Sequence, residues 1–110
     1  MLFRSATAFN TSSDRKLKTN FRAHDPTGPL FDAFRVWEFD WKASGETQRY
    51  GMVAQEVHEL YPDAVTPGDE NNNWGIDYSK FVPLLIAEIK DLRERLADVE
   101  TRLAAMERNE

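Results

Sequence analysis

The sequence predicts an α+β fold in which a small unit of short strands and helices joins an extended N-terminal arm to a long C-terminal helix. Two patterns carry this prediction. Apolar and polar residues alternate over residues 34–41, as in half-buried strands, and residues 82–106 repeat apolar side chains at steps of three and four, as in coiled coils. A chain of 110 residues has room for one small domain with a modest core, so oligomerisation would add burial that it needs.

The first 33 residues show no strong periodicity, which is typical of an arm rather than of a packed unit. Residues 2–10 fit an extended strand, and residues 23–29, AHDPTGP, contain the residues that favour turns. We therefore expect this part of the chain to extend from the domain, with residues 23–29 as a connector.

Two short strands are predicted in the middle of the chain. Trp37, Phe39 and Trp41 alternate with acidic residues, which gives the first strand an aromatic face. Residues 49–55, RYGMVAQ, form the second candidate strand. The glycine within it, Gly51, indicates a bulge or a close backbone approach.

A helix is predicted next, over residues 54–61. Val57, Leu60 and Tyr61 share one of its faces. Pro62 ends it, because proline lacks the amide N–H that a helix interior needs.

The segment before the last helix reads as a loop followed by a short strand. Residues 67–73, PGDENNN, are a loop by composition, and residues 74–78 form the strand. Asp77 or Ser79 is predicted to cap the last helix. Pro83 falls near the first turn of that helix, where it removes few backbone hydrogen bonds.

The last helix carries apolar residues at every a and d position of four heptads, which predicts a coiled coil. About 28 residues at about 1.5 Å each make a rod of about 40 Å, which is longer than a small domain needs. The residues of this seam are Val82, Leu85, Ile89, Leu92, Leu96, Val99, Leu103 and Met106.

The charges beside the seam favour parallel, identical chains. In that arrangement each g residue faces an e residue of opposite charge five places on in the neighbour. The seam does not decide between two and three chains, and a single amphipathic helix packed on its own domain is the alternative. The facing pairs are Glu88 with Arg93, Arg95 with Glu100, and Arg102 with Glu107.

The formal net charge of −5 argues against a nucleic-acid partner, because such partners are bound by basic surfaces. The charge is unevenly distributed. Residues 1–31 hold five Lys or Arg against two Asp, a balance of +3, and residues 45–78 hold one Arg against seven Asp or Glu, a balance of −6. The basic arm is thus expected to attract the acidic middle, within one chain or between chains.

Several other classes are excluded by what the sequence lacks. There is no cysteine, and His24 and His58 are the only imidazoles, so we expect no metal site. The sequence has no glycine-rich phosphate loop, and we expect no cofactor. No apolar run reaches the roughly 18 residues of a membrane span, and the N-terminus lacks the apolar core of a signal peptide, so we expect a soluble chain without a membrane partner.

One constellation of chemical interest remains, in TSSDRKLKTNF at residues 11–21. A serine becomes a nucleophile when a base takes its proton, and a lysine is such a base when burial or a positive neighbour lowers its pKa. Ser13 precedes Lys16 by three places and Lys18 by five, and spacing alone does not choose between them. Ser13 and Lys18 meet only through a turn or across a subunit boundary, and a solvated charged loop is the simpler interpretation.

Three blocks of sequence, taken in order, resemble the C-terminal intramolecular chaperone domain of phage endosialidases, tailspikes and neck appendages, a self-cleaving peptidase family. The resemblance extends from Ser13 to Leu103, and FDWK matches a further short motif of the family. The sequence departs from the family at Lys16, where arginine is usual, and at Met52, where an aromatic residue is common. The blocks are SDRKLK at 13–18, GMVAQEVHELYPDAV at 51–65 and IDYSKFVPLLIAEIKDL at 76–92.

The resemblance implies a serine–lysine dyad in a serine endopeptidase that cleaves itself once. Ser13 corresponds to the nucleophile and Lys18 to the base, and the bond cut is that between Ser12 and Ser13. The implied domains are residues 1–12 as the end of an upstream fibre, residues 13–78 as the α+β chaperone and peptidase unit, and residues 79–110 as the coiled-coil helix.

The resemblance also implies the biological setting. Members of the family form a parallel homotrimer, drive assembly of the upstream fibre polypeptide of the same precursor, and then cut themselves off. The implied protein is a phage tail protein precursor that is made and cleaved in the bacterial cytoplasm, with its parent fibre in the virion. Two alternatives are a trimerisation tip that never cuts and an adhesion module that uses Trp37, Trp41 and Trp74 as a sugar- or partner-binding surface.

Overall fold

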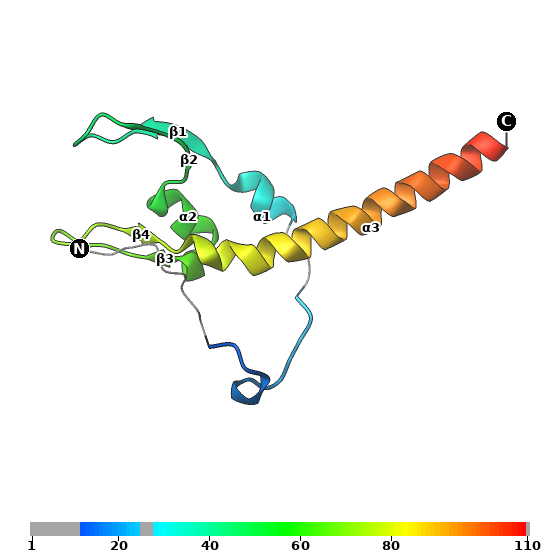
Figure 1. Cartoon of the computed structure of the whole chain (residues 1–110), viewed down its shortest axis with the longest axis horizontal. Coiled ribbons are helices and arrows are strands. Elements are labelled where there is room, and N and C mark those ends of the chain that lie inside the picture. Colours follow the sequence, from blue (N-terminus) through cyan, green and yellow to red (C-terminus); the bar gives the residue numbers. More distant parts are fainter. Residues whose placement is uncertain (1–11, 25–27, 110) are drawn as a thin grey trace.

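The structure is a computed structural model of the chain and describes residues 12–24 and 28–109. A small body of strands and short helices carries an arm on one side and a long helix, α3, that projects away from it (Figure 1). The molecule is extended, with principal dimensions of 66 × 43 × 28 Å. The predicted α+β class with a long C-terminal helix is confirmed, whereas the strand expected over residues 2–10 lies outside the described residues.

The body contains two separate antiparallel sheets of two strands each, with short helices between them. Strand β1 pairs with β2, and β3 pairs with β4. In chain order its elements are α1 (Gly28–Ala33), β1 (Trp37–Asp40), β2 (Thr47–Gly51), α2 (Ala54–Leu60), the 3₁₀ turn η2 (Pro62–Ala64), β3 (Val65–Thr66), β4 (Gly75–Ile76) and the 3₁₀ turn η3 (Tyr78–Lys80).

The β1–β2 hairpin contains the irregularity that Gly51 predicts. Trp37 pairs with Gly51 but Phe39 pairs with Gln48, so the register shifts between the two pairs. A Cβ atom at Gly51 would lie 2.5 Å from the Phe39 ring, so the ring and the backbone approach closely. Both the bulge and the close approach are therefore confirmed. The turn closes through Gly45, whose φ of 75° is a left-handed conformation that glycine adopts without strain.

The boundaries of the two strands differ from those predicted. The first strand begins at Trp37 rather than three residues earlier, because the Phe34 ring turns away to pack 5.3 Å from the Phe81 ring. The second strand covers Thr47–Gly51, and Ala54 already begins α2. Packing of Phe34 on the core thus overrides the alternating pattern of the sequence.

The core is small and lies where α2, β3 and the start of α3 meet. Val57 on α2 is 1% exposed, Ala64 is equally buried, and Phe81 is 7% exposed. The ring of Tyr61, at the end of α2, lies 5.5 Å from the Phe81 ring. The predicted helix, its buried face and its end before Pro62 are confirmed.

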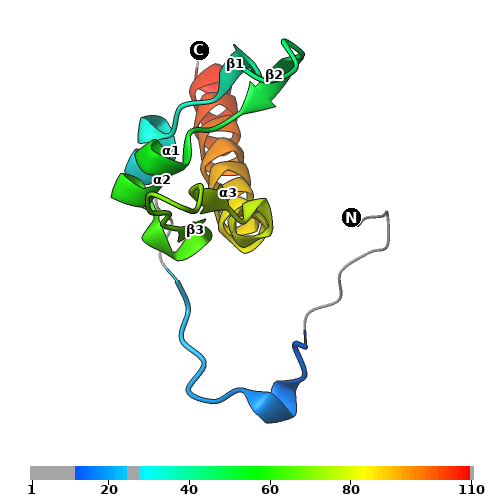
Figure 2. The same cartoon turned by 90° about the vertical axis from the view of Figure 1, so that its left-hand side faces the viewer.

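Helix α1 was not expected, because residues 23–29 read as a connector. Its six residues make fewer than two turns, which is too short for an apolar repeat to be visible. The helix lies alongside α3 in both views of the chain (Figures 1 and 2). Gly28 faces the Glu88 side chain, and Phe31 shares a cleft with Leu85 and Ile89 of α3.

Helix α3 covers Phe81–Arg108, which is the length predicted for it. The Asp77 carboxylate accepts a hydrogen bond from the Ser79 backbone N–H at 3.1 Å and caps η3, which runs directly into α3. The cap predicted for the last helix is thus found on η3 instead, because Lys80, the residue before α3, makes no side-chain cap hydrogen bond. Among the helices of the described ranges, none is long and apolar enough to cross a membrane.

Candidate functional site

The arm, residues 12–24, contains one short 3₁₀ turn, η1 (Arg15–Leu17). The carboxylate of Asp14 accepts a hydrogen bond from the Lys16 backbone N–H at 2.9 Å. The backbone adds two bonds, from Leu17 N–H to the Asp14 carbonyl at 3.0 Å and from Lys18 N–H to the Arg15 carbonyl at 3.1 Å. Aspartate favours such turns because its short side chain reaches the backbone two residues on.

This turn brings Ser13 and Lys18 together. The ammonium group of Lys18 donates a hydrogen bond from Nζ to Ser13 Oγ at 2.5 Å. Lys16 points elsewhere, with its Nζ 3.9 Å from Asp14 Oδ2. Of the two lysines that spacing left open, Lys18 is the one in contact with the serine, and the contact is made through a turn. The roles of Ser13 as nucleophile and Lys18 as base remain predictions.

The rest of the arm is also organised locally. The guanidinium of Arg15 lies 5.3 Å from the centre of the Phe21 ring, a cation–π contact. Asn20 takes a left-handed conformation with φ of 55°, and its carbonyl accepts a hydrogen bond from Arg22 at 2.9 Å. Asparagine tolerates this conformation better than most residues. The arm therefore has a defined path without a core of its own.

The site is fully exposed in the single chain. Ser12, Ser13 and Lys18 are all exposed, and the arm extends away from the body (Figure 2). A lysine acts as a base when it is neutral, which requires burial or a positive neighbour. The turn thus supplies the contact between the two side chains, and the surroundings that favour a neutral lysine have to come from another part of the molecule or from another chain.

The seam of α3 is exposed along its whole length. Its eight apolar side chains are between 43% and 68% exposed, and the C-terminal half of the helix projects beyond the body (Figure 1). This arrangement does not fit the alternative in which the helix packs on its own domain. An apolar stripe of this length is typical of a surface that another chain covers.

The charges beside the seam are partly engaged within the chain. Arg95 lies 3.7 Å from Asp91 and Arg102 lies 3.4 Å from Asp98, each one turn back on the same helix. Exposed pairs of this kind contribute little and can exchange partners. Glu88 differs from the expectation of a facing pair, because it is 8% exposed beside α1.

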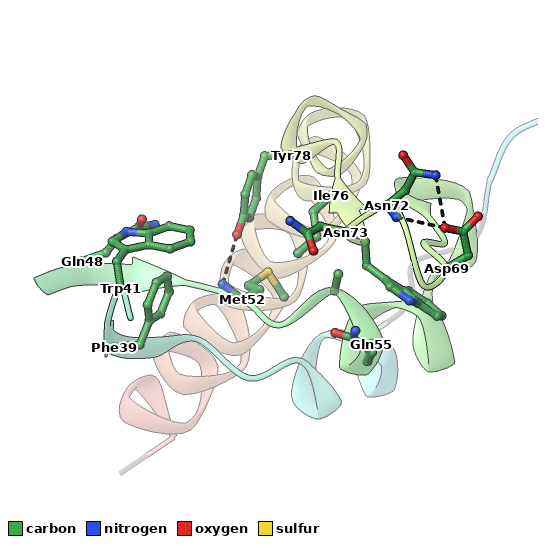
Figure 3. A pocket seen from close by; sticks show the side chains of 12 residues that line it. Phe39, Trp41, Gln48, Met52, Gln55, Asp69, Asn72, Asn73, Ile76 and Tyr78 are labelled. Atoms are coloured by element: carbon green, nitrogen blue, oxygen red, sulfur yellow. Dashed lines mark hydrogen bonds between the residues drawn. The ribbon is translucent and has the colours of Figure 1, made fainter. Parts of the chain in front are cut away.

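A groove of about 500 Å³ lies between the β1–β2 hairpin and the segment around β4 and η3 (Figure 3). Trp41 and Trp74 line it together with Phe39 and Tyr78. Trp37 is not among its lining residues, so the groove brings together two of the three tryptophans considered for adhesion. Sequence reasoning missed the groove because its walls come from segments that are far apart along the chain.

The walls of the groove are held by hydrogen bonds and ring contacts. The Met52 backbone N–H donates to the Tyr78 hydroxyl at 3.0 Å, and the Phe39 and Trp41 rings meet edge to face at 5.1 Å. The pKa of Asp69 lies below its usual value, chiefly because its carboxylate accepts hydrogen bonds from the backbone of Asn71 and from the side chain and backbone of Asn72. Asp69 is thus an anion at the rim.

Comparison with known protein families agrees with the resemblance seen in the sequence. Residues 13–66 match the family described as chaperone of endosialidase, so the recognition of that domain is confirmed. The match starts at Ser13, includes Lys18 and ends before α3. A search among curated proteins finds no relative of the chain. The match supports an intramolecular chaperone role in general and a peptidase-related domain.

Proposed function

We propose that this chain, whose residues 13–66 match the chaperone-of-endosialidase family, trimerises, guides folding of an upstream phage tail fibre or tailspike, and then releases itself by cutting the Ser12–Ser13 bond. The observation that carries the proposal is the 2.5 Å contact between Lys18 Nζ and Ser13 Oγ at the first residues of the matched segment. The setting proposed is the bacterial cytoplasm, with the parent fibre entering the virion.

The chemical step follows from the position of Ser13 directly after the bond. Its Oγ attacks the carbonyl carbon of Ser12, while neutral Lys18 takes the Oγ proton and passes it to the departing amide nitrogen of Ser13. The C–N bond breaks, an ester joins the Ser12 acyl group to Ser13 Oγ, and the residue-13 amine is released. Water then hydrolyses the ester, which yields the Ser12 carboxylate and restores the Ser13 hydroxyl.

Assembly through α3 explains when the cut takes place. Three parallel helices hold the upstream ends in register and raise their effective concentration, which helps a fibre whose strands pair between distant segments and chains. Burial on assembly favours the neutral lysine, so the dyad becomes active after the chains associate. Cleavage removes the template for refolding, so the mature fibre is trapped kinetically. An uncleaved fibre that unfolds no faster than the cleaved one would contradict this last step.

The first experiment is intact mass spectrometry of the chain expressed with an N-terminal extension. Wild type is expected as a fragment that begins at Ser13, and Ser13→Ala is expected whole, because the variant lacks the attacking oxygen. Ser12→Ala is the matched control and should still be cut, since the Ser12 side chain has no role in the step. Hydroxylamine added during the reaction should trap the ester as a hydroxamate on residue 12.

The second candidate is a trimerisation tip that does not cut, and the exposed seam of α3 favours it independently of the dyad. Under this alternative, wild type and Ser13→Ala both stay whole while light scattering reports a trimer. A fragment of wild type alone excludes it.

A further inference from the structure

We propose that the groove between the β1–β2 hairpin and η3 receives the arm, residues 12–24, of a second copy of the chain. This inference rests on the proposed function and deepens it, because it names the surface that covers the dyad after assembly. Three observations carry it: the apolar side chains that the arm leaves exposed, the chemistry of the groove, and the opposite charges of the two surfaces.

The arm exposes apolar side chains that its own turn does not cover. Leu17 is 67% exposed and Phe21 is 62% exposed, although the backbone of the turn between Asp14 and Lys18 is hydrogen-bonded. What the turn lacks is therefore apolar contact rather than backbone hydrogen bonds. A segment with a defined path loses less conformational entropy when it docks than a disordered one does.

The groove offers aromatic surfaces that suit such side chains. Trp41 is 53% exposed and Tyr78 is 50% exposed, and both face the groove (Figure 3). The Trp74 ring is supported from behind by His58, at 5.2 Å edge to face. Aromatic rings bind apolar side chains by burial and bind lysine or arginine over their faces. Because these rings are already held in place, docking requires little rearrangement.

The two surfaces also carry opposite charge. The arm holds four Lys or Arg against one Asp, a balance of +3. The segments that form the groove, residues 37–51 and 69–78, hold six Asp or Glu against two Lys or Arg, a balance of −4. Asp69 at the rim is one of these acidic groups, and hydrogen bonds from Asn71 and Asn72 lower its pKa further below its usual value. Opposite charges steer the arm to this face and fix its orientation.

The position of the arm favours a second copy over the same chain. In Figures 1 and 2 the arm extends below the body, whereas the β1–β2 hairpin that forms one wall of the groove lies at the top of the body. Parallel association through α3 places the body of one chain beside the arm of the next. A covered Ser13–Lys18 contact then exists in the assembly and not in the separate chain.

Cysteine cross-linking tests the docking directly, because the chain contains no native cysteine. One tagged copy carries Thr19→Cys on the arm, and a differently tagged copy carries Asn73→Cys in the groove. After co-expression and oxidation, a disulfide between the two differently tagged copies should form about tenfold faster than in the control pair. The reason is that docking raises the effective concentration of one thiol near the other. The control replaces the groove cysteine by Glu59→Cys, an exposed position on α2 outside the groove.

Light scattering on the same samples distinguishes a failure of the docking from a failure of the proposed function. Trimers that cross-link no faster through Asn73→Cys than through the control overturn the docking and leave the proposed function standing. A variant that carries both cysteines in one chain gives a further test. If its trimers form the disulfide only within a chain and not between chains, docking onto a second copy is also overturned. Samples that remain monomeric contradict the proposed function and the docking together. As a second readout, Trp41→Ala should slow cleavage about tenfold while the trimer persists, as loss of a docking contact predicts.

Discussion

The arm and helix α3 leave the same small body and are both exposed, but they differ in which contacts the chain itself already provides. In the arm, a turn of five residues already brings Lys18 Nζ to 2.5 Å from Ser13 Oγ. In α3 the backbone is satisfied by the helix, while eight apolar side chains remain 43–68% exposed. The Ser13–Lys18 contact is therefore encoded locally, whereas we predict that the environment in which these two groups react depends on association of the chains.

The largest effect is expected from breaking the seam. Leu92→Asp together with Leu96→Asp places two charges where the proposed trimer would bring neighbouring chains together. Both side chains are more than half exposed in the single chain, so the body should stay folded. We expect loss of the trimer by light scattering and loss of cleavage by mass spectrometry. Ala97→Asp is the control, because it adds one charge of the same sign on the helix side away from the seam. Efficient cleavage by the monomeric double variant would refute the dependence on assembly.

The next effect distinguishes the two lysines of the arm. Lys18→Ala removes the group in contact with Ser13 and should slow cleavage by about 10²–10⁴-fold, the usual contribution of a general base. Lys16→Ala removes only an exposed ion pair with Asp14 and should change the rate by less than about fivefold. Single-turnover rates of the two variants measure the difference. A slower Lys16→Ala than Lys18→Ala would reverse the assignment of the base.

A smaller effect is expected from the turn that positions the dyad. Asp14→Ala removes the carboxylate that accepts from the Lys16 N–H, and a lost cap of this kind lowers the population of the turn by about fivefold. Cleavage should slow by a similar factor. Asp14→Asn keeps an acceptor oxygen and should retain most of the rate. If both variants cut at the wild-type rate, the turn is formed by the assembly rather than by the arm itself.

The smallest effect concerns the junction between the body and α3. The pKa of Asp77 lies below its usual value of 3.8, first because the Ser79 side chain donates a hydrogen bond to the carboxylate. Slight desolvation opposes this shift, and the Ser79 N–H and the charge of Lys80 add to it. Because the folded pKa is depressed, the ionised group stabilises the fold above that usual value, and the contribution is lost as the pH falls through the lowered pKa.

Asp77→Asn tests this sign, since asparagine also caps but does not titrate. The difference in melting temperature, wild type minus variant, should decrease by a few degrees as the pH drops from about 5 to below 3. A constant difference over this range would show that ionisation of Asp77 does not contribute. The melting temperatures of both proteins are measured by circular dichroism, from the helical signal to which α3 contributes most.

The sequence by itself determined the features that depend on spacing or on one residue's backbone chemistry. The repeat of apolar residues located α3, the pattern of Val57 and Pro62 located α2, and Gly51 marked the irregular pair in the hairpin. Three blocks of sequence, taken in order from Ser13, were sufficient to recognise the family. These features can be predicted from a single sequence because each depends on residues that are near neighbours along the chain.

Only the tertiary structure decided which groups meet. Within the arm, the local path of η1 rather than the spacing placed Lys18 and not Lys16 on Ser13. The tertiary structure added α1, which is too short to show a repeat, and with it the burial of Glu88. It formed the groove from Trp41 on one side and Trp74 and Tyr78 on the other. Trp41 is distant from the other two in the chain and shares a surface with them only after the hairpin and η3 pack against the core. Contacts across the groove depend on the fold as a whole, so no local sequence pattern predicts them.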